Sequence, residues 1–129
     1  MTGADYTAAI GKILEPYDRA DAQLKAAAAR RNVPGISKAT AAYASAAATA
    51  ADQVERLVPP VGVDDAQASY VAALRNAIQP LRKLASATAT LSTSPDTVGR
   101  LGQEANRAVK RAGKKLQALF EELSSVHSG

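Results

Sequence analysis

The four tyrosines are the residues whose side chains could contribute most to a binding site. Tyr6, Tyr17, Tyr43 and Tyr70 lie on apolar stripes of helical periodicity, so we expect partly buried rings whose hydroxyls need partners. Tyr6 and Tyr70 are predicted to lie at the same end of the molecule, where they could form the polar mouth of a cavity for a small ligand. Because a helix rises about 1.5 Å per residue, Tyr17 lies roughly 16 Å beyond Tyr6, so the four rings cannot form one pocket. In the alternative interpretation, the rings only fill gaps between alanines in the core.

A run of cations near the C-terminus is the second candidate site. The formal net charge is +4, and the excess lies in residues 65–129, which hold nine basic and five acidic residues. Such a segment can contact an anionic partner, which would be nucleic acid or an anionic membrane surface, or it can form a solvated helix face. No aromatic residue lies among these cations for base stacking, and no nucleic-acid-reading motif is visible, which argues against nucleic acid. The cations are Arg100, Arg107, Lys110, Arg111, Lys114 and Lys115.

Residues that usually carry catalysis or bind metals are scarce. The chain has no cysteine and a single histidine, His127, near its C-terminus. This composition excludes a disulfide framework, a thiolate metal site and a multi-histidine metal site, and it argues against a histidine-based triad. Acidic and basic residues spaced i,i+4, such as Glu15 and Arg19, are typical of helix surfaces. No phosphate-binding glycine loop occurs. We therefore expect a protein that is not an enzyme and that uses no metal or cofactor.

Four segments of helical periodicity must position these residues. Alanine accounts for 30 of the 129 residues, and the larger apolar residues recur at spacings of three and four. Turn signals at Asn32–Gly35, Pro59–Gly62 and Ser92–Pro95 separate the segments, and such short connections favour antiparallel neighbours. The sequence predicts one all-α domain over residues 1–129. It is expected to be an antiparallel up-down-up-down four-helix bundle, with helices at about 4–31, 36–58, 64–91 and 95–126.

Local signals refine the helix ends. Asp64, with Gln67 three residues later, is typical of an N-cap with a capping box. Ser94 is a second predicted N-cap, followed by Pro95 at the first helical position. Pro16 and Pro80 lie inside stripes that continue in phase on both sides. They therefore predict kinks and not helix ends.

An internal repeat is suggested by these prolines. A shift of 64 residues places Tyr6 on Tyr70 and Pro16 on Pro80. The repeat predicts two αα-hairpins, each with a kinked first helix, packed with approximate two-fold symmetry. Chance matching in an alanine-rich chain is the alternative.

One pattern in the middle of the chain resembles a known group of proteins. Leu57–Pro60 ends a predicted helix with Leu-Val-Pro-Pro, and Tyr70–Leu74 places an aromatic residue and Ala-Leu in the next helix. This arrangement resembles small alanine- and arginine-rich cell-envelope proteins of high-GC Gram-positive bacteria, lipoproteins among them. The resemblance covers about a fifth of the chain. It implies a non-enzymatic helical bundle of the cell envelope that binds a protein partner or a small ligand.

The location of the protein follows from the same resemblance. Residues 1–5 lack the basic and apolar regions of a signal peptide, and no apolar run is long enough to span a bilayer. The resemblance implies a signal and a lipid-modified cysteine upstream of residue 1, hence an extracytoplasmic, lipid-anchored protein. If Met1 is the native start, we expect instead a cytoplasmic bundle that binds nucleic acid or an anionic surface through its basic fourth helix. The oligomeric state stays open.

Overall fold

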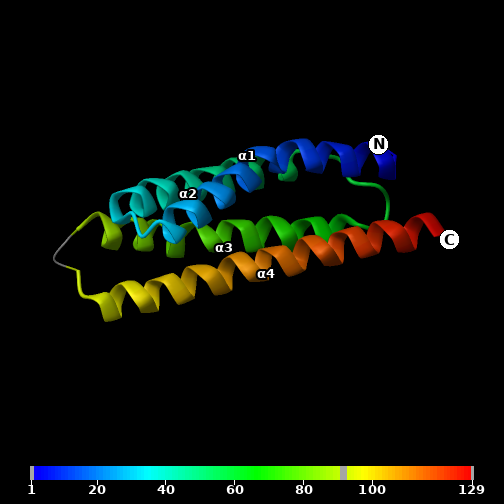
Figure 1. Cartoon of the computed structure of the whole chain (residues 1–129). Coiled ribbons are helices and arrows are strands. Elements are labelled where there is room, and N and C mark those ends of the chain that lie inside the picture. The colour runs from blue at the N-terminus through cyan, green and yellow to red at the C-terminus, as the bar shows by residue number, and fades with distance from the viewer. Residues whose placement is uncertain (1, 91–92, 129) are drawn as a thin grey trace.

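Four antiparallel helices form the molecule. The computed structural model describes residues 2–90 and 93–128, which contain α1 (Gly3–Ala29), α2 (Val33–Glu55), α3 (Asp64–Ala89) and α4 (Pro95–Ser128). Figure 1 shows α1 and α3 running in one direction and α2 and α4 in the other, with the start of α1 and the end of α4 at the same end. The predicted all-α, up-down-up-down four-helix bundle is confirmed.

Most helix ends agree with the local signals. α4 begins as predicted, because the Ser94 hydroxyl accepts a hydrogen bond from the Thr97 amide at 3.2 Å. α2 begins at Val33, three residues before the predicted start at 36, and it ends at Glu55, three residues before the predicted end at 58. There the Asn32 side chain accepts a hydrogen bond from the Gly35 amide at 3.2 Å, and a proline is tolerated in the first turn. The predicted end of the third helix at residue 91 lies outside the described residues.

The two internal prolines do not end their helices. α1 continues through Pro16 and α3 continues through Pro80, as predicted. Each helix therefore keeps one apolar stripe on both sides of its proline, from Tyr6 to Ala20 in α1 and from Tyr70 to Thr88 in α3.

The predicted capping box of α3 is wrong. Val63, which is fully buried, takes the N-cap position without a side-chain cap, and Asp64 is the first helical residue. The Gln67 side chain does not turn back to the cap. Its Nε2 donates to the Leu57 carbonyl at 3.2 Å, and its Oε1 accepts a hydrogen bond from the Tyr6 hydroxyl. A buried amide needs partners for both of its ends, and these two core groups supply them.

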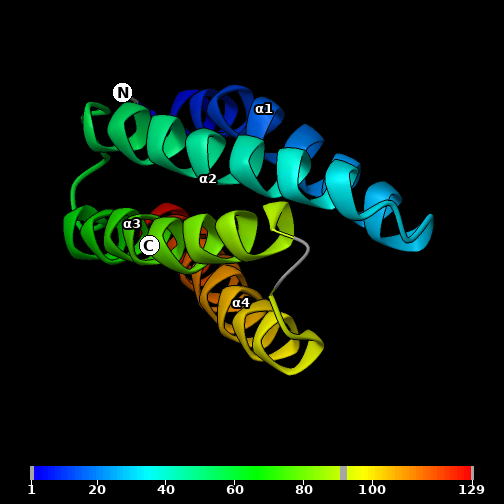
Figure 2. The same cartoon turned by 90° about the vertical axis from the view of Figure 1, so that its left-hand side faces the viewer.

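The helices form two layers, and three of the four seams between neighbouring helices are closely packed. Figure 2 shows α1 and α2 above α3 and α4, with α4 crossing α3 at an angle. α2 packs against α1 and α3, and α3 packs against α4, whereas α1 and α4 meet at only a few points. Small residues on α2, including the buried Ala44, Ala47 and Ala51, allow close helix approach. The bundle is therefore open along the seam between α1 and α4.

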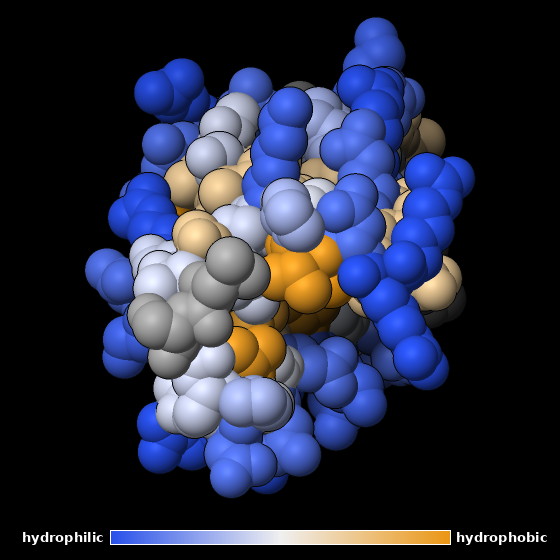
Figure 3. Space-filling model, turned by 60° about the vertical axis from the view of Figure 1, so that its left-hand side comes forward, coloured by the Kyte–Doolittle hydropathy of each residue, from blue (hydrophilic) through white to orange (hydrophobic). Residues whose placement is uncertain are grey.

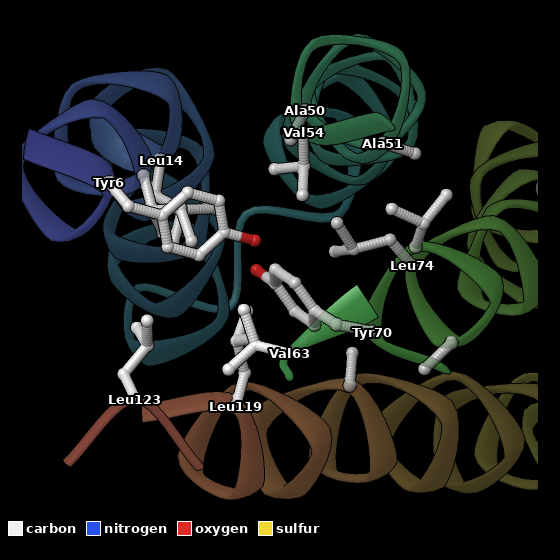
Figure 4. Packing of buried hydrophobic residues seen from close by; sticks show 14 residues of the cluster. Tyr6, Leu14, Ala50, Ala51, Val54, Val63, Tyr70, Leu74, Leu119 and Leu123 are labelled. Atoms are coloured by element: carbon white, nitrogen blue, oxygen red, sulfur yellow. The ribbon is translucent and has the colours of Figure 1, made fainter. Parts of the chain in front are cut away.

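Two apolar clusters fill the interior. One surrounds Tyr6, Leu74 and Leu119 near the chain termini (Figure 4), and the other surrounds Tyr43 and Leu81 toward the opposite end. Figure 3 looks toward that opposite end and shows hydrophobic surface in a hollow framed by hydrophilic side chains. Within the described ranges, no helix is both long enough and apolar enough to cross a membrane.

Candidate ligand-binding cleft

A cleft of about 430 Å³ occupies the open seam between α1 and α4. All four helices contribute to it, since α2 and α3 form its floor through Tyr43 and Tyr70. α4 leaves room at Gly113, where an added Cβ atom would meet nothing within 4 Å. The complete lining is Leu14, Tyr17, Asp18, Asp21, Lys25, Tyr43, Tyr70, Asn106, Val109, Lys110, Ala112, Gly113 and Leu116.

Tyr17 and Tyr43 form an aromatic pair in the cleft. Their ring centroids lie 4.8 Å apart at an interplanar angle of 61°, an edge-to-face contact that aromatic rings favour. Burial raises the pKa of both hydroxyls. For Tyr17, hydrogen bonding by Tyr43 lowers the pKa in part, while the carboxylates of Asp21 and Asp18 raise it further. Both tyrosines are therefore neutral at pH 7.

Tyr70 on α3 has a hydroxyl without a hydrogen-bond partner among the described residues. Its side chain is 2 % exposed, and its hydroxyl makes no hydrogen bond to another described residue. Every buried side-chain polar atom without solvent access does have a partner within the described ranges. The Tyr70 hydroxyl therefore keeps access to solvent-filled space. Burial raises its pKa, and the charges of Tyr17 and Asp18 add to this.

Tyr6 lies outside the cleft, and its hydroxyl has a hydrogen-bond partner in the core. Figure 4 shows the Tyr6 and Tyr70 hydroxyls pointing toward one another between the helices. Tyr6 is fully buried and donates its hydrogen bond to Gln67. Burial, assisted by the charge of Asp64, raises its pKa to about 12. The structure thus places Tyr6 and Tyr70 at the same end, as predicted, but only Tyr70 lines the cleft.

The α1 wall of the cleft is acidic. Asp18 and Asp21 follow Tyr17 on this helix, and Asp21 is paired with Lys25 at 2.8 Å. Asp18 makes no ion pair with any residue in the described part of the chain. Partial burial raises the pKa of Asp18, and the neighbouring Asp21 charge raises it further. Neither carboxylate was among the predicted site residues, although Asp21 lies one helical turn after Tyr17, a spacing that places the two on one face.

The six cations of the basic segment of α4 lie in three different environments. Lys110 lines the cleft, and Lys115 lines a depression next to Asp65 and Glu122 on the α3 side. The remaining four cations are exposed on the outward side of α4. Within residues 2–90 and 93–128, none of the six lies within ion-pair distance of a carboxylate. The outward four are Arg100, Arg107, Arg111 and Lys114.

The fold and the cleft define an all-α four-helix bundle with a side cleft. Comparison of the chain with protein-family models, with curated proteins and with solved structures finds no match. The described residues include no group of three His, Cys, Asp or Glu side chains that could hold a metal ion.

Proposed function

We propose that this protein is a non-enzymatic binding protein whose ligand enters the cleft between α1 and α4. The observation that carries the proposal is the convergence of Tyr17, Tyr43 and Tyr70, from three different helices, in one cleft. Ligand sites in proteins are concave and combine apolar walls with a few converging polar groups. Leu14, Val109 and Leu116 supply the apolar part of this lining.

The electrostatics of the cleft favour binding over catalysis. The raised pKa values keep the three tyrosine hydroxyls protonated at pH 7, so they act as hydrogen-bonding groups and not as nucleophiles. The other lining groups are carboxylates, lysines and an amide. The lining contains no Ser, Cys or His side chain that a base could activate.

Tyrosine-ring NMR with a fragment library tests this proposal. A cleft ligand should shift the signals of Tyr17, Tyr43 and Tyr70 and leave the signal of Tyr6 unchanged. Single Tyr→Phe variants would assign the four signals.

A variant that fills the cleft provides the decisive comparison. Gly113→Leu should abolish these shifts, because Gly113 lines the cleft and an added side chain there meets free space that the ligand would otherwise occupy. Gly99→Leu is the matched control, since Gly99 is exposed on the same helix, also has free space, and lies outside the cleft. Fragments that bind equally well to Gly113→Leu would contradict the proposal.

The outward cations of α4 support a second candidate function, which is contact with an anionic surface. Four exposed cations on one helix face, without an ion pair to any described carboxylate, suit nucleic acid or an anionic membrane. Neutralising Arg100, Arg107, Arg111 and Lys114 to Gln should then remove salt-sensitive binding to duplex DNA or phosphatidylserine vesicles. Neutralising four exposed cations on other helices, namely Lys12, Arg19, Arg82 and Lys83, should have a much smaller effect. Binding that is absent or insensitive to salt would eliminate this candidate.

The cell-envelope location stays a prediction that the resemblance alone supports. Fractionation of the source cells, with mass spectrometry of the native N-terminus, tests it. A lipid-modified or signal-cleaved N-terminus in the envelope fraction is the expected result. An intact Met1 in the cytosol would discard the resemblance.

A further inference from the structure

One carboxylate in the cleft lining forms no ion pair with a described residue. Asp21 shares its charge with Lys25 at 2.8 Å, whereas Asp18 has no ion-pair partner within the described ranges. Lys110 stands on the opposite wall, but it is exposed, and a lysine ammonium on its flexible stem can turn toward water. Asp18 is exposed as well, but its short side chain stays close to α1. On the α1 wall, beside Tyr17, two carboxylates therefore accompany one lysine.

The carboxylates of Asp18 and Asp21 influence the tyrosines of the cleft. Asp18 raises the pKa of Tyr17 and Tyr70, and Asp21 raises the pKa of Tyr17 and Tyr43. No cation acts in the opposite direction on any of the three. The α1 wall of the cleft thus carries one excess negative charge, through Asp18, Asp21 and Lys25, while Lys110 lies on the α4 wall.

Aromatic rings add a second preference for positive charge. The face of a tyrosine ring attracts cations through its quadrupole. Tyr17 is only half-buried, and its edge-to-face contact with Tyr43 leaves it in the lining of the cleft. Inorganic cations need several oxygen ligands, and the described residues offer no such cluster.

We infer that the cleft between α1 and α4 selects an organic ammonium ion, that is, an amine carried on an apolar body. The ammonium group lies beside Asp18 and Tyr17, and the apolar body packs on Leu14, Val109 and Leu116. Tyr70 lines the same cleft from α3. This inference rests on the proposed function and specifies its ligand class.

Three probes of similar shape and different charge test the inference. They are 2-phenylethylammonium, 2-phenylethanol and phenylacetate, each titrated at pH 7 into the full chain and followed by tyrosine-ring NMR. The ammonium probe should shift Tyr17, Tyr43 and Tyr70 but not Tyr6. It should bind about fivefold or more tightly than the alcohol, because the charge pairs with Asp18 and with the ring face. Phenylacetate should bind most weakly.

Two isosteric variants locate the selectivity. Asp18→Asn should reduce the affinity for 2-phenylethylammonium about fivefold and leave the affinity for 2-phenylethanol unchanged. Glu15→Gln removes the same charge from an exposed position on α1 outside the cleft and should change neither affinity. Circular dichroism would verify that both variants are folded.

The outcomes separate this inference from the proposed function. If 2-phenylethanol binds in the cleft as tightly as the ammonium probe, the charge selectivity is wrong and the binding cleft stands. If Asp18→Asn and Glu15→Gln lower the affinity equally, Asp18 does not recognise the ligand and the inference fails. If no probe shifts the three cleft tyrosines, the inference also fails, and the fragment screen with Gly113→Leu then decides the proposed function.

Discussion

Tyr6 and Tyr70 occupy similar places near the starts of α1 and α3, but their hydroxyls have different partners. The Tyr6 hydroxyl donates to the buried Gln67, while the Tyr70 hydroxyl makes no hydrogen bond to another described residue. A shared residue type and a shared register therefore do not make the two tyrosines equivalent. The predicted internal repeat stays a prediction, and at this pair the polar contacts differ.

The two tyrosines should respond differently to loss of the hydroxyl. Tyr6→Phe leaves the Gln67 Oε1 buried without its donor, so the free energy of unfolding should fall by about 1–2 kcal/mol. Tyr70→Phe removes a hydroxyl without a hydrogen-bond partner among the described residues, so it should change stability by less than about 0.5 kcal/mol. Urea denaturation of the two variants and the wild type measures both values. Equal losses would show that Tyr70 also has a structural partner.

The raised tyrosine pKa values predict a stability that falls at alkaline pH. The pKa of Tyr6 rises from 10.0 to about 12 on folding, so the folded state favours the neutral phenol. A group of this kind stabilises the fold fully below pH 10.0, and its contribution is lost as the pH rises toward about 12. Urea denaturation at stepped pH should show a constant free energy of unfolding up to about pH 10 and a decline above it. Tyr6→Phe should show a shallower decline, and an identical decline would contradict this cause.

At the scale of the helices, most of the architecture follows from periodicity and turn signals. Ser94 and Pro95 mark the start of α4 in the sequence and in the structure, because their interactions are local. The cap of α3 could not be predicted in the same manner. The Gln67 side chain is hydrogen-bonded to Tyr6, on α1, and to the Leu57 carbonyl, in the segment after α2. Only the folded core brings these groups together.

Pro16 lies inside α1 directly before Tyr17 and Asp18, so the course of the helix here positions the cleft. Pro16→Ala should restore an amide that can donate to the Lys12 carbonyl, and it should raise the free energy of unfolding by about 1–3 kcal/mol. Pro16 is exposed, so the smaller side chain leaves no cavity. Thermal and urea denaturation would measure the change. A destabilised variant would show that the packing of α1 depends on the proline.

The cleft itself is a property of the whole molecule. Apolar stripes on four helices predict a bundle, but they do not specify whether its fourth seam closes. In this chain the α1 side of that seam carries small residues such as Ala4 and Ala8, and α4 carries Gly113, so the two helices leave grooves between them. Tyr17, Tyr43 and Tyr70 come from separate helices. Only their packing shows that they share one cleft and that Tyr6 does not.

The open seam predicts that α1 is the least protected helix. α3 packs against two helices along its length, whereas α1 packs mainly against α2. Local opening requires less free energy where fewer buried contacts are lost. Amide protons in α1 should therefore exchange with solvent about tenfold or more faster than those in α3, as measured by hydrogen-exchange NMR. Uniform protection across α1 and α3 would indicate that the bundle opens as one unit.

The start of α1 and the end of α4 lie at the same end of the molecule (Figure 1), which determines how the molecule responds to mechanical tension. A force that separates the two termini acts first on the tips of these two helices. Because α1 and α4 meet at only a few points, little resists their separation. The load then peels α1 from α2 and α4 from α3 turn by turn, instead of shearing whole helix faces at once. Held by its two ends, the bundle would extend gradually and at low force.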